Sequence, residues 1–279
     1  MVRLVPMGYL KKTFASLLGA GLVCLSSLDA AEAQTPSAEP KRADPASQVE
    51  PQAQAAHDIE RDPKTGNITA EYYWLGEVHH RLGGPAVIEY DKNTGQVLSE
   101  EYWRSFETGI GKPHRDGDLP ATIEYDYSSG KKIVVMETWW HNGFPDRDNA
   151  PEHIERDATT GKIVAEEYWH HGKCDRSDGP AKLEYHPVHG KDAPPLKEIY
   201  YHASKLDRAG GPALIRRDPE TFRVVTEHYW RKNLLHREDG PAIIDRDPQT
   251  GQVTHEEFWI NGRKVDAPPK PQPPPRPSP

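Results

Sequence analysis

Apolar and polar residues alternate in short runs along the middle of the chain, and the runs come in pairs. The first run of a pair reads Ala-x-Ile-Glu-Tyr/Arg-Asp, as in 86–91, and the second reads Val-x-x-Glu-x-Tyr-Trp, as in 97–103. Alternation with a period of two, in runs rich in β-branched and aromatic residues, is typical of β-strands. Between the runs stand segments such as Asp-Pro-Lys-Thr-Gly at 62–66, which favour a tight turn. Each pair of runs therefore predicts one β-hairpin.

The hairpin pattern recurs seven times between about Asp58 and Asp266. A dipeptide ending in proline opens each unit after the first, and these prolines, 29 to 35 residues apart, are Pro85, Pro120, Pro151, Pro180, Pro212 and Pro241. No segment carries sustained helical periodicity. The sequence predicts an all-β fold, an elongated array of about seven tandem hairpins in one twisted antiparallel sheet. With ~14 strands at ~4.8 Å each, such a sheet would extend ~65 Å along its hydrogen-bonding direction.

The period of two also assigns side chains to the faces of this sheet. We expect the Ile, Val and Trp positions to share an inward face that neighbouring hairpins cover by stacking. The second run carries a glutamate three residues before its last aromatic in every unit, namely Glu71, Glu100, Glu137, Glu166, Glu198, Glu227 and Glu256. These glutamates are predicted to form a charged ladder on the opposite, solvated face.

An aromatic residue ends the second run of every unit. The seven are Trp74, Trp103, Trp140, Trp169, Tyr201, Trp230 and Trp259. Two interpretations stand side by side. In one, the rings stack as structural elements of the core; in the other, they form an exposed platform for sugar rings or peptide side chains.

The connectors between units carry a repeated His-Arg or Asp-Arg pair. The arginines are Arg81, Arg115, Arg147, Arg176, Arg208 and Arg237. They could bind carboxylate or phosphate groups of a partner, or they could pair with the repeated glutamates or stack on a Trp face. The fifth unit departs most from the pattern, with an insertion at 191–195. Since insertions map to loops on one face of a repeat array, Lys191 and Asp192 are further candidates for partner binding.

The ends of the chain predict export and two segments without structure. Residues 1–33 combine a basic start, an apolar stretch and a small-x-small pattern, which is typical of a signal peptide. Residues 34–57, rich in Ala, Pro and Gln, and the proline-rich 267–279 lack the apolar mass that folding needs. The expected domain is therefore 58–266, in a periplasmic or secreted protein without a transmembrane segment in its mature form. Only Cys174 remains in that form, so stability must come from packing.

The composition narrows the class of function. The chain has 279 residues and a net charge of −8, which argues against a nucleic-acid partner. Its 14 histidines show no metal-ligand spacing, so no metal or cofactor is expected. Catalytic carboxylates need distinct environments, whereas here one environment recurs in every unit. The sequence predicts no catalytic residues and a protein that is not an enzyme.

The aromatic pair and glycine of 168–172, followed by Gly179-Pro180, resemble the MORN-type repeats, especially their bacterial variant form. The resemblance covers residues 58–266. It implies an elongated sheet of tandem hairpins and a scaffold that binds proteins or lipids without chemistry of its own. We therefore expect a protein-binding scaffold or adaptor of the cell envelope whose partner is an unidentified protein or envelope component. The alternative is a module that binds cell-wall glycans through the Trp and Tyr rings, and lipid contact stays open.

Overall fold

The computed structural model describes residues 55–105, 111–147 and 150–266. Strands and turns make up this part of the chain, and it contains no helix. The first strand begins at Ala55, three residues before the predicted start of the domain at 58. The predicted signal peptide, nearly all of the predicted 34–57 linker and the tail at 267–279 lie outside the described residues.

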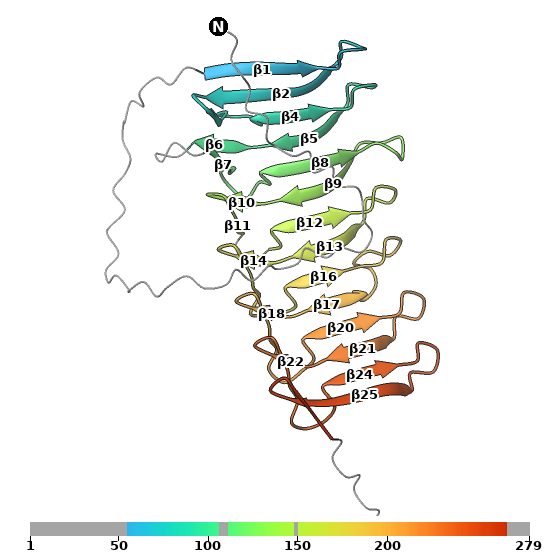
Figure 1. Cartoon of the computed structure of the whole chain (residues 1–279). Coiled ribbons are helices and arrows are strands. Elements are labelled where there is room, and N and C mark those ends of the chain that lie inside the picture. Colours follow the sequence, from blue (N-terminus) through green and yellow to red (C-terminus); the bar gives the residue numbers. More distant parts are fainter. Residues whose placement is uncertain (1–54, 106–110, 148–149, 267–279) are drawn as a thin grey trace, which may run out of the picture. The chain divides into compact units, whose positions relative to one another are not determined.

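One long antiparallel sheet carries the seven units (Figure 1). Its strands, in spatial order, are β1 (Ala55–Arg61), β2 (Ile68–Leu75), β4 (Val87–Tyr90), β5 (Val97–Glu101), β8 (Thr122–Asp126), β9 (Ile133–Thr138), β12 (His153–Arg156), β13 (Ile163–Glu167), β16 (Lys182–Glu184), β17 (Lys197–Ile199), β20 (Leu214–Arg217), β21 (Val224–His228), β24 (Ile243–Arg246), β25 (Val253–Ile260) and β26 (Arg263–Val265). Each strand pairs with its neighbours in chain order, so contacts are local and the sheet stays open. This confirms the predicted elongated array of hairpins.

A row of short hairpins runs along one side of the long sheet (Figure 1). Five of them form separate two-stranded ladders: β6 (Trp103–Ser105) with β7 (Gly111–Pro113), β10 (Trp140–His141) with β11 (Phe144–Pro145), β14 (Trp169–His170) with β15 (Lys173–Cys174), β18 (Tyr201–His202) with β19 (Lys205–Leu206), and β22 (Trp230–Arg231) with β23 (Leu234–Leu235). In the first unit β3 (Val78–His79) pairs with β2, and in the last β26 pairs with β25. Five of these hairpins have two-residue turns with positive φ at both positions, as at Asn142 (52°) and Gly143 (81°), which is the conformation that matches the twist of a tight hairpin.

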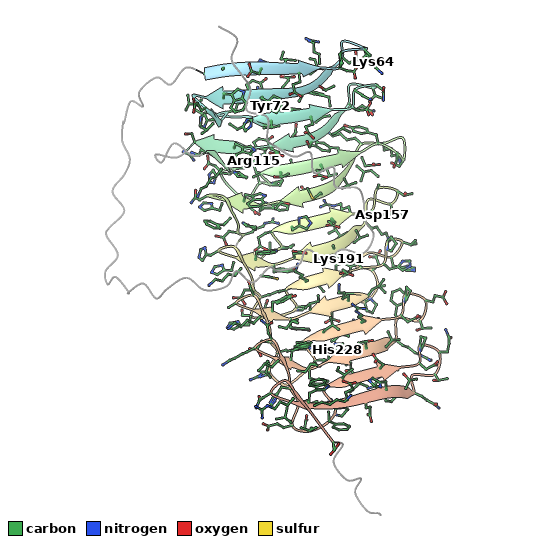
Figure 2. All side chains as sticks on the ribbon, viewed as in Figure 1. Lys64, Tyr72, Arg115, Asp157, Lys191 and His228 are labelled. Carbon is green, nitrogen blue, oxygen red and sulfur yellow. The ribbon has the colours of Figure 1, made fainter. Side chains whose placement is uncertain are left out.

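The turns of the long hairpins form the opposite edge, where Figure 2 labels Lys64 and Asp157. In the second unit an oxygen of Asp91 accepts the backbone N–H groups of Asn93 (2.9 Å) and Thr94 (2.7 Å), and the Gly95 N–H donates to the Asp91 carbonyl. The same contacts recur at Asp62, Asp218 and Asp247. Hydrogen bonds from the backbone, that of Thr94 first, lower the pKa of Asp91. The turn aspartates therefore serve the fold itself.

The ladder register corrects the predicted assignment of faces. Ile88 lies opposite Glu71 on one side and Glu100 on the other, and residues opposite each other point to the same side of a sheet. The prediction that Ile shares a face with Trp, opposite the glutamates, is therefore wrong. The prediction placed apolar positions of the two strands on one face because they are apolar. Which positions share a face is decided by the register of the paired strands, and this register shifts by a bulge between Glu89 and Tyr90. We call the side with Ile88 the Ile face and the side with Glu89 the acidic face.

The most deeply buried position of five units holds a small residue. The alanine after the unit's proline is completely buried in five units, as Ala86, Ala121, Ala181, Ala213 and Ala242. On the Ile face, Ile154, Leu183 and Ile244 are also buried. Because the array is one sheet thick, the remaining large side chains are mostly half-buried between neighbours of adjacent units.

Candidate binding surface

The repeated glutamates join one unit to the next. Six of the seven accept a hydrogen bond from a tyrosine or pair with an arginine at the end of the following unit's first strand, at 2.5 to 3.0 Å. The pairs are Glu71–Tyr90, Glu100–Tyr125, Glu137–Arg156, Glu166–Tyr185, Glu198–Arg217 and Glu227–Arg246. Burial, and then the bond to Glu71, raises the pKa of Tyr90 to about 12. The prediction of a solvated ladder is wrong for these glutamates, since Glu166 is only 3% exposed and its pairs stabilise the joint.

The connector arginines lie against the second-to-last aromatic of their own unit rather than against the last. The guanidinium carbon lies 3.7 to 4.0 Å from the ring centre for Arg81 on Tyr73, Arg115 on Tyr102, Arg147 on Trp139, Arg176 on Tyr168, Arg208 on Tyr200 and Arg237 on Tyr229. Each also donates to the carbonyl of the proline that opens the next unit, at 3.0 to 3.4 Å. These contacts clamp the connector to the start of the following strand. The side chains keep limited exposure, 18% for Arg147 and 25% for Arg176.

The residue before the arginine joins neighbouring short hairpins. The Nδ1 atom of His80 accepts the Ser105 N–H at 3.0 Å, and that of His236 accepts the Asn261 N–H at 3.2 Å. Asp146 takes the same role by accepting the N–H of His171. The arginine of the repeated pair thus contacts an aromatic ring of its own unit and the first proline of the next unit, and the His or Asp contacts the next short hairpin.

The seven terminal aromatics are all half-buried. Three of them donate from the indole Nε1 to a glutamate two residues earlier: Trp103 to Glu101 (2.7 Å), Trp169 to Glu167 (3.0 Å) and Trp259 to Glu257 (2.7 Å). These glutamates lie on the acidic face, because Glu101 is opposite Val87 and Thr122 in the ladder. The aromatic row therefore borders the acidic face, packed on one side and open on the other.

The acidic face carries a row of exposed carboxylates at one repeated position. They are Glu60, Glu89, Glu124, Glu155 and Glu184, in five successive units, followed by Arg216 and Asp245. Neighbouring members are two strands apart, which is ~10 Å. Desolvation and the nearby charge of Glu89 raise the pKa of Glu101 and of Glu124. The row is a coherent negative stripe, in which His153 contacts Glu155 and Lys197 contacts Glu184.

The insertion of the fifth unit folds back onto the fourth. Lys191, labelled in Figure 2, lies 2.8 Å from the carboxylate of Glu166, and Asp192 lies 2.8 Å from Lys162. The side chains of Lys191 and Asp192 are nevertheless 52% and 80% exposed. Both candidates thus support the joint between two units and still present polar surface.

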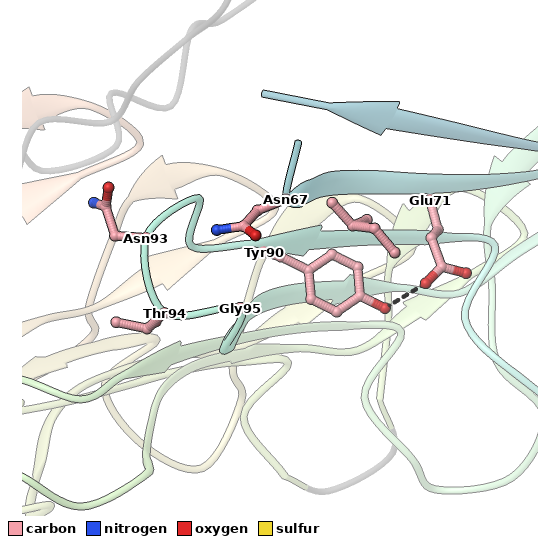
Figure 3. A pocket seen from close by; sticks show the side chains of 7 residues that line it. Asn67, Glu71, Tyr90, Asn93, Thr94 and Gly95 are labelled. Atoms are coloured by element: carbon pink, nitrogen blue, oxygen red, sulfur yellow. Dashed lines mark hydrogen bonds between the residues drawn. The ribbon is translucent and has the colours of Figure 1, made fainter. Parts of the chain in front are cut away.

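A hollow that the sequence did not indicate lies between the first two turns (Figure 3). Its volume is about 480 Å³, and it is lined by Asn67, Ile68, Glu71, Tyr90, Asn93, Thr94 and Gly95. The Tyr90 hydroxyl donates to Glu71 there at 2.7 Å. Since its main polar groups belong to the turns and the Glu–Tyr joint, the hollow adds no independent chemistry.

Among the described residues, no group of three or more His, Cys, Asp or Glu side chains is placed to hold a metal ion. Nor does that part of the chain contain a helix of the length and apolarity that a membrane span requires.

No family model matches the chain, and no curated protein matches it in sequence.

Proposed function

We propose that the chain is an exported, non-enzymatic scaffold whose acidic face binds another protein of the cell envelope. The observation that carries this proposal is the exposed stripe from Glu60 to Glu184, which repeats every ~10 Å along the array. The other repeated polar groups, the arginines and the ladder glutamates, are engaged in contacts within and between units. A long, repetitive surface that is mainly negative suits an extended partner that carries basic side chains.

The resemblance to MORN-type repeats and the sequence of residues 1–33 support the same proposal. Repeat arrays of this kind act through surface rather than through a single cleft. A signal peptide would deliver the protein to the periplasm or outside the cell. The partner is therefore sought among envelope proteins.

Charge reversal tests the acidic face. The variant Glu89→Lys, Glu124→Lys, Glu155→Lys should lose the partner that the unaltered protein captures from an envelope extract. A matched control, Glu77→Lys, Glu220→Lys, Glu238→Lys, makes the same change in net charge at exposed positions away from the stripe and should keep it. Capture by the natural chain should also weaken with salt, because exposed charges are screened over ~8 Å at physiological ionic strength. Equal capture by both variants would reject the acidic face, and catalytic turnover in a hydrolase screen would reject the scaffold.

Replacing Trp169 separates this proposal from glycan binding through the aromatic row. Because the indole is half-buried and bonded to Glu167, Trp169→Ala should lower the free energy of unfolding by about 2 kcal/mol, roughly half the cost of a fully buried Trp. The amount of partner protein that each folded molecule captures should not change. Urea denaturation and the capture assay measure the two quantities. An unaltered unfolding free energy together with lost binding to isolated cell-wall glycan would favour the glycan alternative.

A further inference from the structure

The joints between successive units share one pattern of contacts, with a tyrosine or an arginine as the partner of the repeated glutamate. The second strand of one unit pairs with the first strand of the next, as β21 does with β24. Across that joint Glu227 binds Arg246 at 3.0 Å, and beside it the turn of the next short hairpin donates from Gly262 to the carbonyl of Leu235 at 2.9 Å. Each inner unit therefore contributes one half of this interface on the side of its first strand, which we call its front. It contributes the other half on the side of its second strand, which we call its back.

The first unit presents a front half that no unit of the described chain covers. Strand β1 pairs only with β2, and all seven of its residues are exposed. Ile59 is 43% exposed, whereas Ile154 and Ile244 at the same position are 8% and 6% exposed. Arg61 occupies the position from which Arg156, Arg217 and Arg246 bind the glutamate of the preceding unit.

The last unit presents the complementary back half. Strand β25 pairs with β24 on one side, and β26 covers only Phe258 to Ile260 on the other. Within the described chain, the ladder edge at 255–257 is open. Glu256, the last glutamate of the repeated series, is exposed, as are Val253 (45%) and Val265 (42%). The chain after Asp266 is a poor strand for this edge, because most of 267–279 is proline, which cannot donate to a ladder.

We propose that the two ends bind each other in different copies, so that the protein associates head to tail with a second copy of itself. Strand β1 of one copy adds antiparallel to β25 of the other, which places Ile59 opposite Glu256. Arg61 then binds Glu256, and the N–H of Glu77 donates to the Lys264 carbonyl, as Gly262 does to Leu235, because Lys264 lies opposite Trp259 as Leu235 lies opposite Trp230. Because the two surfaces in contact differ, a pair of copies still has one unoccupied front and one unoccupied back. Further copies can therefore add at either end, and the assembly grows in one dimension.

The charges at this joint set its strength below that of the inner joints. Asp58 would lie opposite Glu257, a pair of like charges, although Lys264 already binds Glu257 at 2.7 Å. Glu60 would lie opposite His255, which offsets part of this repulsion. The inner joints also hold units of one chain together, whereas two copies must lose translational freedom. The association is therefore reversible and depends on concentration.

Sedimentation velocity of the purified chain over increasing concentration tests this inference. We expect species that grow stepwise with concentration. Arg61→Glu alone and Glu256→Arg alone should each weaken association about tenfold or more, because each sets like charges against each other at the joint. An equimolar mixture of the two variants should restore association, since every joint in an alternating assembly then pairs Glu with Arg. Both positions are exposed, and an unchanged melting temperature verifies that each variant is folded.

Three results would overturn the inference. One is a natural chain that stays monomeric up to about 1 mM, where an association worth ~4 kcal/mol is half complete. The second is weakening by Arg61→Glu but not by Glu256→Arg, which would indicate that two β1 strands pair with each other. The third is a mixture that associates no better than either variant alone. None of these results bears on the acidic face, so failure here is distinguishable from failure of the proposed function.

Discussion

Replacing Glu152 by glutamine is expected to stabilise the protein by about 3 kcal/mol at pH 7 and to change its stability little at pH 4. Glu152 stands where five other units have a completely buried alanine, and it is itself only 1% exposed. Its carboxyl accepts the backbone N–H of Trp169. Burial raises the pKa of Glu152 to about 8, and the charge of Asp146 adds to this, while the backbone bonds oppose it.

The sign of the pH dependence follows from that raised pKa. Below about pH 4.5 the carboxyl is protonated in both the folded and the unfolded chain, so it contributes no pH-dependent difference. Between about pH 4.5 and pH 8 the unfolded chain releases the proton while the folded chain keeps it, and stability falls with rising pH. Above pH 8 the loss levels off at about 3–5 kcal/mol. Glutamine stays neutral throughout, so the variant lacks this loss.

Urea denaturation at pH 4, 7 and 9 measures the effect. Glu155→Gln is the matched control, because Glu155 lies three residues later, in β12, but is exposed, and its hydrogen bond with His153 lowers its pKa. The Glu155→Gln variant should still lose stability between pH 4.5 and pH 8, as the natural protein does. If the natural protein and Glu152→Gln lose the same free energy of unfolding between pH 4 and pH 9, the buried carboxyl is not the source.

Some of this structure follows directly from the sequence, and some depends on register. Alternation and turn chemistry predict the hairpins, because Asp91 and Gly95 form their turn with local contacts alone. The faces are not predictable in this way, since the slip between Glu89 and Tyr90 is a property of the paired strands. Aligning the units does show Glu152 at an alanine position, but its burial depends on packing against the next unit.

The candidate site shows the same division. The repetition of the arginines indicated a structural role as one of two interpretations. Which ring each arginine contacts depends on the path of the connector, and that path brings Arg208 to Tyr200 instead of Tyr201. The acidic stripe is visible in sequence only after the register has placed Glu89 and Glu124 on one face.

Replacing Arg208 by alanine is expected to lower the free energy of unfolding by about 2–4 kcal/mol, the sum of a partly desolvated cation–π contact and a charged hydrogen bond. The guanidinium lies 3.7 Å from the centre of the Tyr200 ring and donates to the Pro212 carbonyl at 3.0 Å. On its other side it packs so closely on Gly211 that an added Cβ there would come within 3.2 Å of the guanidinium carbon. Arg208→Lys should recover little, because an ammonium group lacks the planar shape that fills this gap.

Arg216→Ala provides the matched control, because this arginine is exposed on the acidic face of the following unit, in β20. It should change stability by no more than about 0.5 kcal/mol, as is usual for exposed positions. Hydrogen exchange adds a spatial readout. Because units contact only their neighbours, Arg208→Ala should speed exchange in β20, β21 and β24 much more than in β4 and β5. Equal stability losses for the two variants would mean that Arg208 acts through charge alone, and uniform acceleration along the sheet would mean that the array unfolds as a single cooperative block.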